Sequence, residues 1–203
     1  MISWLNPGRP IILASRSPRR KAILSQMGFT FTTQNPSPID ETAYINPADL
    51  SRSLKKLAFA KARSIARRRP GSLVLGADTV VVKGTRVFGK PRDRNEAFSM
   101  LKRLSNAGHT VLTAVALVCD EVSFSTAAVA RTDVFFRLLA VDEIEAYLDR
   151  GEYRDKAGAY AIQGRAMVFI DSIRGCYYNV VGLPVSETIR AFDRFVLSRR
   201  KKR

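Results

Sequence analysis

Two adjacent arginines, Arg19 and Arg20, stand where the sequence predicts the first turn of a helix. Ser17 is a good N-cap residue and Pro18 fits the first helical position, so we expect a helix to begin here. The start of a helix carries unpaired N–H groups and a partial positive charge, which two arginines would oppose. An anion bound by this turn, by the guanidinium groups and by the neighbouring Ser15 would resolve the conflict. A solvated basic helix start explains the same residues without a ligand.

Two more charged residues fall where apolar ones are expected. Lys61 lies on the apolar stripe of a long predicted helix, four residues after Leu57, where it either faces an anion or extends its ammonium group to solvent. Asp78 interrupts the run LVLGADTVVV at residues 73–82, otherwise one of the most apolar runs in the chain. A carboxylate in a buried strand needs an ion-pair partner, hydrogen bonds or a cation, unless it marks the end of the strand.

These residues match one kind of chemistry when they are taken together. The cations are Arg19, Arg20, Lys61 and Lys90, which stands in the tight loop GKP, and the carboxylates are Glu41 and Asp78. Cationic side chains, two acids and the start of a helix are what a metal–triphosphate site requires. Each feature by itself has an ordinary structural explanation.

The elements that must position these residues alternate along the chain. We expect strands at residues 11–14, 73–82, 111–119 and 123–136, and helices at 17–28, 47–69, 93–104 and 184–197. Asp142, with Glu145 three residues later, resembles a capping box for a further helix that ends at Gly151. Residues 167–173 and 177–181 are expected to form a strand pair. Interleaved strands and helices predict an α/β fold with a mixed sheet.

The charge of the chain is unusual, whereas its other bulk properties are ordinary. The net charge of +16 is compatible with nucleic acid, a membrane surface or a polyphosphate as partner. Eight positive residues and no acid lie in residues 52–69, and we expect most of them on the solvent face of one helix. Five more form residues 199–203, which we expect to be a disordered tail after a single domain at residues 1–198.

Several function classes are disfavoured by the composition. No apolar run is long enough to span a membrane, and the first residues do not resemble a signal peptide. The two cysteines, Cys119 and Cys176, are far apart, which favours thiols in a reducing compartment. One histidine and two cysteines disfavour a zinc site. We therefore expect a cytoplasmic protein with no membrane partner.

Seven short blocks stand in order along the chain: LASRSPRR (13–20), DE (40–41), LAFAKA (57–62), GADTVV (76–81), GKP (89–91), DKAGAYAIQG (155–164) and VGLP (181–184). In these blocks, from about residue 11 to residue 184, the chain resembles the Maf family of nucleoside triphosphate pyrophosphatases. Their number and order make the resemblance specific. One departure is Asn106, which replaces a glycine that the family usually has three residues before the histidine, so the turn there can differ.

The resemblance implies a fold, a reaction and a cofactor. The fold would be a mixed, strongly bent β-sheet flanked by helices, with two lobes around a central cleft, similar to that of inosine triphosphatase. The reaction would be hydrolysis of a nucleoside triphosphate to the monophosphate and pyrophosphate with a divalent metal cation, Mg²⁺ or Mn²⁺. The block that ends AYAIQG resembles the subgroup that acts on dTTP and UTP, with modified pyrimidine nucleotides as further candidates.

The resemblance also implies a role for each site residue. Asp78 resembles the family's proton acceptor, and Glu41 would join it in holding the metal or orienting the attacking water. Arg19, Thr79 and Gln163 correspond to positions linked with substrate choice, although a β-branched residue such as Thr79 is also at home in a strand. Phosphate binding would fall to Ser15, Arg19, Arg20, Lys61 and Lys90.

The main alternative is a nucleic-acid-binding or cell-division (septum) regulatory protein that uses the basic surface. Against it, the candidate cations accompany acids, and no sheet with interleaved aromatic and basic residues is evident. We therefore expect a nucleoside triphosphate as the partner, and nucleic acid only as non-specific binding through the basic tail. A homodimer is also compatible with the sequence.

Overall fold

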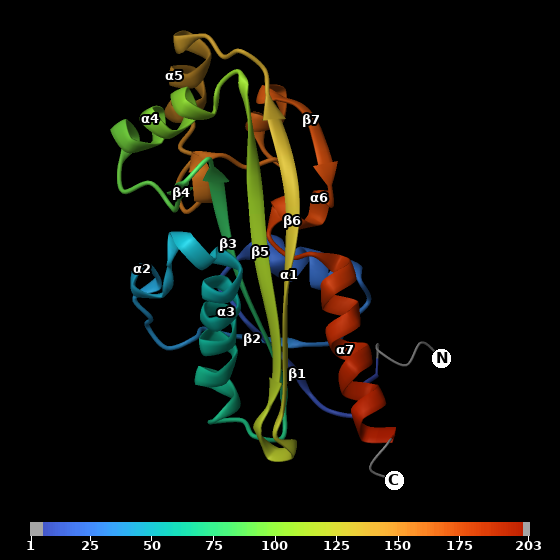
Figure 1. Cartoon of the computed structure of the whole chain (residues 1–203). Coiled ribbons are helices and arrows are strands. Elements are labelled where there is room, and N and C mark those ends of the chain that lie inside the picture. The colour runs from blue at the N-terminus through green and yellow to red at the C-terminus, as the bar shows by residue number, and fades with distance from the viewer. Residues whose placement is uncertain (1–5, 201–203) are drawn as a thin grey trace. The chain divides into compact units, whose positions relative to one another are not determined.

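The chain forms a mixed β-sheet with helices packed on it, seen in a computed structural model that describes residues 6–200 (Figure 1). Within the described residues the sheet has seven strands, in the order β2-β1-β3-β5-β6-β7, with β4 paired to β3. The strands are β1 (Ile11–Ala14), β2 (Thr32–Gln34), β3 (Leu73–Lys83), β4 (Arg86–Phe88), β5 (Ala107–Cys119), β6 (Phe124–Phe136) and β7 (Ile170–Gly175). The predicted α/β class with a mixed sheet is confirmed; the strong bend and the central cleft stay predictions.

The helices are α1 (Pro18–Gln26), α2 (Glu41–Tyr44), α3 (Leu50–Ala66), α4 (Arg94–Leu104), α5 (Val141–Asp149), α6 (Tyr177–Val181) and α7 (Val185–Arg200). Most of the helices were predicted, but α2 was not, and α6 was predicted as a strand. Short 3₁₀ turns are η1 (Pro47–Asp49), η2 (Asp120–Val122), η3 (Ala157–Ala159) and η4 (Arg165–Phe169). The chain is organised as two compact units. The first holds residues up to Asp78, Thr113–Ala130 and everything from Gly182, and the second holds Thr79–Leu112 and Arg131–Val181.

The first unit packs helices on both faces of its part of the sheet. β1 runs parallel to both β2 and β3. Alternate side chains of β1, among them Ile12 and Ala14, pack with Ala62 and Ile65 of α3 in one buried cluster. Figure 1 shows α7 on the opposite side of β5 and β6 from α3. There Phe192 of α7 contacts Phe29, with ring centroids 4.6 Å apart.

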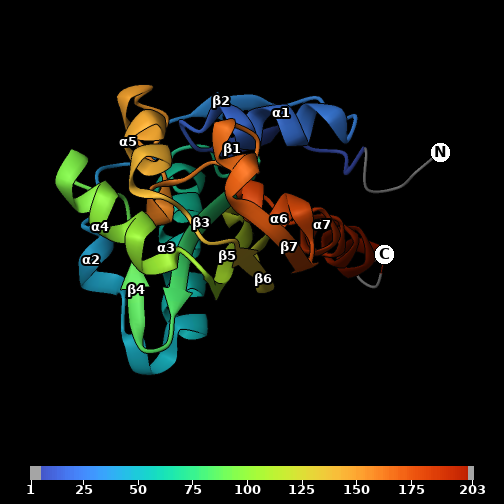
Figure 2. The ribbon, with the colours of Figure 1, turned by 90° about the horizontal axis from the view of Figure 1, so that it is seen from above.

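The second unit has its own apolar core. The predicted inward face of α4 is buried, and with α5 it covers a cluster that includes Phe88, Phe136 and Phe169. α4 and α5 lie side by side in both views (Figures 1 and 2). Asp93 caps α4, as predicted, because its Oδ1 accepts from the N–H of Glu96 at 2.7 Å.

The predicted strand at residues 177–181 is wrong, because this segment is helix α6. β7 pairs antiparallel with β6, and its predicted first residues, 167–169, instead belong to η4. Val and Tyr favour strands, but tertiary contacts override that preference here. The side chain of Asn179 is buried and donates to Val111 O and to Thr132 Oγ1, both at 3.0 Å. These bonds fix the segment against β5 and β6 without adding a strand.

The predicted capping box of α5 is also wrong. The helix begins at Val141, so Asp142 is already inside it. Glu143 Oε2 instead accepts from the N–H of Ala140 at 3.0 Å, and Arg137 binds both carboxylate oxygens of Glu143. These bonds, chiefly the one from Arg137, lower the pKa of Glu143 to about 2. The end of the helix is as predicted, with Gly151 at φ +70°.

Asn106 keeps the backbone turn that a glycine would make. Its φ is +50°, in the left-handed region that asparagine tolerates better than most residues. Its N–H donates to Arg137 O at 3.0 Å. The departure from the family pattern therefore leaves a left-handed turn at this position.

Two smaller expectations concern the basic segments and the short elements. Seven of the eight positive residues at 52–69 are exposed, as predicted, and Lys61 alone among them is buried. The predicted helix is too long, however, because α3 ends at Ala66 and residues 67–69 follow it. Helix α7 includes Arg199 and Arg200, and the rest of the predicted tail lies outside the described residues. The sequence did not predict the three-residue strand β2. Among the described residues, every helix is too short or too polar to cross a membrane.

Candidate functional site

Lys61 is the centre of a buried ion-pair cluster in the first unit. Its side chain is only 10% exposed, and its Nζ donates to Asp78 Oδ1 at 2.5 Å and to Glu41 Oε1 at 2.6 Å. The two residues that looked misplaced in the sequence, Lys61 and Asp78, are therefore partners. We call Glu41, Lys61 and Asp78 the Lys61 cluster.

A close approach between α3 and β3 brings Lys61 to Asp78. A Cβ on Gly76 would collide with the carbonyl oxygen of Ala58 and would lie 2.9 Å from the backbone nitrogen of Ala62. Glycine therefore lets the backbone of α3 pack directly against β3 at the helical turn that contains Lys61. Asp78 follows Gly76 by two residues and so leaves the same face of β3. Replacing Gly76 would push apart the two elements that hold this ion pair.

Glu41 reaches the cluster from the start of the short helix α2. Asp40 is the N-cap of this helix, and its Oδ1 accepts from the N–H and the hydroxyl of Thr42. These bonds hold the pKa of Asp40 below its ordinary value, and the bond from the Thr42 hydroxyl has the largest effect. Asp40 therefore caps the helix, whereas Glu41 binds Lys61 in the cluster. The Glu41 side chain is 41% exposed against 9% for Asp78, so the cluster has one sealed and one solvent-facing carboxylate.

Arg20 lies in the electrostatic field of the two carboxylates. Burial lowers the pKa of its guanidinium group, and Arg19 lowers it further, whereas Asp78 and Glu41 raise it. Its Nε donates to the carbonyl oxygen of Gly182 at 2.8 Å, which fixes the plane of the guanidinium group. The predicted conflict of charges at this helix start is therefore eased in part by acids from other elements.

The start of α1 is built as the sequence predicts. Ser17 caps the helix, because its Oγ accepts from the N–H of Arg20, and Pro18 is the first helical residue. Ser15 is buried, and its Oγ accepts from the N–H of Ser17 at 3.1 Å. Arg20 Nη1 lies 3.5 Å from the same Ser15 oxygen, a long contact. Arg19 is partly buried in the same turn.

The structure thus gathers some of the predicted site residues and not others. The residues of the first unit are Ser15, Arg19, Arg20, Glu41, Lys61 and Asp78. Lys61 binds the two carboxylates, Arg20 lies near Ser15, and Arg20 is linked to the carboxylates and to Arg19 by electrostatic interaction. The remaining three belong to the second unit: Thr79 is partly buried in β3, Lys90 is exposed after β4, and Gln163 is exposed between η3 and η4. Their roles stay predictions.

Two residues matter to the cluster although sequence analysis gave them no role. Gly76 permits the helix–strand contact, and Gly182 supplies the carbonyl oxygen that holds Arg20. Both lie inside blocks that resemble the Maf family, and this resemblance is the feature of the sequence that could have indicated their importance. A backbone carbonyl has no side-chain signature, so its contribution cannot be inferred from residue type.

The cluster could hold a divalent cation only with help from a ligand. Groups of three or more metal-binding side chains are absent from the part of the chain that the structure describes. Asp78 and Glu41 offer two carboxylates that converge on one cation, the Lys61 ammonium group. Mg²⁺ commonly takes one or two carboxylates and completes its shell with phosphate oxygens and water. The donor set therefore fits a cation that arrives with a polyphosphate.

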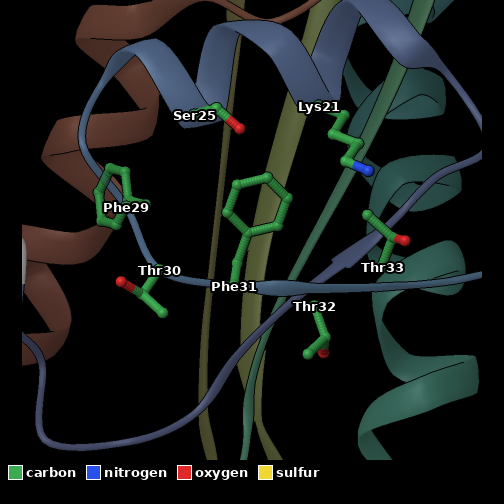
Figure 3. Close-up of a pocket in the computed structure, with 7 residues that line it drawn as sticks. All are labelled: Lys21, Ser25, Phe29, Thr30, Phe31, Thr32 and Thr33. Carbon is green, nitrogen blue, oxygen red and sulfur yellow. The ribbon is translucent and has the colours of Figure 1, made fainter.

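A pocket elsewhere in the first unit does not contain the predicted residues. Its volume is about 570 Å³, and it is lined by Lys21, Ser25, Phe29, Thr30, Phe31, Thr32 and Thr33. Figure 3 shows the Phe31 ring pointing toward α1, between Ser25 and Lys21, from the position just before β2. This pocket has no carboxylate, so it lacks the chemistry of the Lys61 cluster.

Comparison with known proteins agrees with the motifs. The family model described as Maf-like protein matches residues 10–195. The chain is 46% identical over 187 residues to the dTTP/UTP pyrophosphatase of Desulforamulus reducens, covering 92% of this chain and 97% of the relative. It is 48% identical to that of Symbiobacterium thermophilum, covering 91% and 93%, and 49% identical to that of Moorella thermoacetica, covering 86% and 89%. With this match over nearly its whole length, the chain belongs to the Maf family.

Proposed function

We propose that this protein hydrolyses dTTP and UTP to the nucleoside monophosphate and pyrophosphate. The observation that carries the proposal is the Lys61 cluster beside Arg20 at the start of α1, in a chain of the Maf family. The relatives at 46–49% identity that bear the name dTTP/UTP pyrophosphatase support the substrate. Modified pyrimidine nucleotides are further candidate substrates of the same residues.

Asp78 is the proton acceptor in this proposal. Its Oδ1 is engaged by Lys61, so we assign Oδ2 to the proton of the attacking water. Lys61 holds this carboxylate in one place, because its ammonium group also binds Glu41 on the other side. A fixed base within hydrogen-bond reach of water typically contributes about 10²–10⁴ in rate.

Arg19 and Arg20 bind the triphosphate together with Ser15, Lys61 and Lys90. Phosphoryl chemistry depends mainly on positioning and neutralising charge, and arginine forks suit phosphate oxygens. The bond from Nε to Gly182 O orients Arg20, so its Nη nitrogens are the donors that we assign to phosphate. The start of α1 adds a favourable partial charge for the same anion.

A divalent cation, Mg²⁺ or Mn²⁺, would be held by Glu41 and Asp78. When bound, it neutralises phosphate charge and lowers the barrier for attack by water. Lys61 contacts the same two carboxylates, so it keeps them together before the cation and the nucleotide arrive. This arrangement avoids leaving two carboxylates side by side without a counter-charge.

Gln163, Thr79 and Arg19 select the base in this proposal. The amide of Gln163 both donates and accepts a hydrogen bond, which matches the N3–H and carbonyl edge of uracil and thymine. CTP lacks that N3–H, and a purine is larger. Gln163→Glu removes the donor and should reduce kcat/KM for dTTP and UTP more than for CTP and GTP. If Gln163 only supports its own loop, all four values should fall alike.

Release of pyrophosphate from a panel of nucleotides tests the proposed function. The purified protein is incubated with dTTP, UTP, CTP or GTP, with MgCl₂ or with EDTA. We expect dTTP and UTP to give the highest kcat/KM, and EDTA to abolish turnover. A preference for a purine nucleotide would overturn the substrate assignment. Turnover that survives EDTA would overturn the proposed requirement for a divalent cation.

Location and partners follow from the same proposal. The enzyme acts in the cytoplasm, where its nucleotides are made, and binds nucleic acid only non-specifically through the basic tail. Charge alone supports nucleic-acid binding, and the exposed cations of α3 have no accompanying row of aromatic side chains that would stack on bases. The homodimer stays a prediction for which sedimentation of the purified protein is the direct test.

A further inference from the structure

The chain's single histidine, His109, is buried in the second unit and bonded to one tyrosine. Its Nε2 and Tyr160 Oη are 2.8 Å apart. His109 is 4% exposed and Tyr160 is 5% exposed. Both rings also meet Phe136 edge to face, at centroid distances of 4.9 Å. The three rings make one packed group inside the core of this unit.

The pair is neutral and sealed. Burial, with the charge of Lys83 as a smaller cause, lowers the pKa of His109 to about 4, and burial raises the pKa of the Tyr160 hydroxyl. His109 Nδ1 has no hydrogen-bond partner among the residues that the structure describes. A phenylalanine would pack here without an unsatisfied buried nitrogen, so packing alone does not account for a histidine. The polar function of the ring is its bond to Tyr160.

Tyr160 ends a backbone segment of unusual conformation. Gly158 and Ala159 just before it have φ values of +70° and +63°. Alanine in this left-handed region is strained and persists where its surroundings hold it. Gly158 also has no room for a side chain, because a Cβ there would lie 2.9 Å from Val81 Cγ2. The bond to His109 is one of the contacts that hold this turn.

The same segment carries one residue to which the proposed function gives a role, and it contacts the neighbour of another. Gln163 follows Tyr160 by three residues, and the chain beyond it is held where the N–H of Arg165 donates to Glu152 Oε2 at 2.8 Å. Gly158 N–H donates to Gly89 O at 3.0 Å, one residue before Lys90. Gln163 is thus an exposed side chain on a stretch fastened at Tyr160 on one side and at Arg165 on the other.

We propose that His109 is a positioning residue for base selection: its hydrogen bond to Tyr160 fixes the segment 158–163 and so the direction in which Gln163 is presented. The inference rests on the proposed function, because it requires Gln163 to read the base. His109 itself does not touch the nucleotide in this proposal, and it exchanges no proton with it.

The test measures discrimination, the ratio of kcat/KM for dTTP to that for CTP, in variants of the full chain. Tyr160→Phe removes one hydroxyl, and His109→Phe keeps an aromatic ring without a polar partner. We expect each to lower discrimination about fivefold, the effect of one neutral hydrogen bond. The double variant should lose no more than either single one, because one bond is removed in every case. His109→Gln, which can still bond to a hydroxyl, should recover part of the discrimination.

A matched control separates positioning from a purely structural role. Phe136→Leu disturbs the same ring group but removes no hydrogen bond, so we expect it to lower the melting temperature while discrimination stays at the wild-type value. The proposal is overturned if His109→Phe and Tyr160→Phe lower stability and leave discrimination unchanged while Gln163→Glu alters it. A wild-type protein without preference for dTTP, or a Gln163→Glu variant with normal discrimination, would instead overturn the proposed base reading on which the inference depends.

Discussion

The two units each bury a polar group that a hydrophobic core would normally exclude, and they do so in opposite ways. In the first unit the Lys61 cluster is made of full charges, with the Lys61 ammonium group between Asp78 and Glu41. In the second unit, the His109–Tyr160 pair is neutral and packed among aromatic rings. One arrangement is balanced by opposite charges, and the other avoids charge altogether.

This difference separates groups suited to chemistry from groups suited to positioning. A charged cluster with a solvent-facing member such as Glu41 can exchange its partners when a ligand brings charge of its own. The His109–Tyr160 pair has no exposed member, and burial opposes ionisation of both rings, so it can hold a segment but cannot take part in proton exchange at neutral pH. Four predictions test this distinction, from the largest expected effect to the smallest.

Asp78→Asn should lower kcat for dTTP by about 10²–10⁴, because the amide cannot accept the proton of water. The fold should persist, since Lys61 retains Glu41 as a partner. Steady-state rates and a thermal melt measure both effects. The matched control is Asp133→Asn on β6, an aspartate bonded to Thr110 and Arg131 outside the proposed machinery, which should keep near-normal rates. A near-normal rate in Asp78→Asn would remove Asp78 from the mechanism.

Lys61→Met should lower the free energy of unfolding by about 3 kcal/mol in EDTA, because it leaves an almost buried carboxylate without its cation. The methionine keeps most of the apolar stem of the lysine. MgCl₂ should recover part of the loss, since a cation bound by both carboxylates would replace the ammonium charge. Urea unfolding with EDTA and with MgCl₂ gives both values.

A double variant checks the cause of that loss. Lys61→Met combined with Asp78→Asn removes both the ammonium group and the buried charge, so it should be more stable than Lys61→Met alone. If the double variant is the less stable of the two, the loss in Lys61→Met comes from packing and not from an unpaired charge.

Acid should weaken the fold through His109. Its pKa of about 4 in the folded protein lies below the ordinary value of 6.5, so the folded state binds fewer protons than the unfolded chain between these limits. Stability is therefore full above pH 6.5, falls as the pH decreases through this window, and is down by about 2 kcal/mol at pH 5. Lys83 opposes protonation of His109 and Asp133 favours it. Urea unfolding at pH 7 and pH 5 measures the change.

His109→Gln isolates this effect, because the chain has no other histidine. Glu143, whose pKa is about 2, lowers stability only at more acidic pH, below the ordinary range of a glutamate. The variant should therefore lose the dependence on pH between 7 and 5. An equal dependence in wild type and variant would mean that His109 is not sealed in the neutral form.

Much of the first unit could be predicted from local patterns. The apolar stripe of α3 placed Lys61 on the buried face, and the apolar run around Asp78 predicted either a buried acid or the end of a strand; the acid is buried within β3. Their pairing could not be predicted, because it depends on Gly76 and the close approach of two elements distant in sequence. The same limit applies to Gly182, whose contribution is a backbone oxygen.

The second unit was harder to predict because its polar residues act through tertiary bonds. Asn179 bonds to β5 from a strand-like run that forms α6, and His109 pairs with Tyr160, a residue 51 positions away in the sequence. The ends of α5 show the same limit, since Asp142 is the better N-cap by residue type but Glu143 and Arg137 decide the start. Local preference was reliable where burial alone decided the structure.

The smallest expected effect distinguishes two neighbouring arginines in the first unit. Arg19→Ala should lower kcat/KM for dTTP about tenfold through the loss of a phosphate contact, while the melting temperature of the unligated protein holds or rises. The reason is that a cation is removed from the positive end of α1, a change typically favourable by about 0.3–1 kcal/mol. Arg20→Ala should lower kcat/KM to a similar extent but also lower stability by about 1 kcal/mol, since it removes the bond to Gly182 O. Lys21→Ala is the matched control, because this exposed cation of the same turn lines the separate pocket and should leave kcat/KM unchanged. Equal losses of stability in Arg19→Ala and Arg20→Ala with normal kcat/KM would make both arginines structural and would break the assignment of this helix start to phosphate.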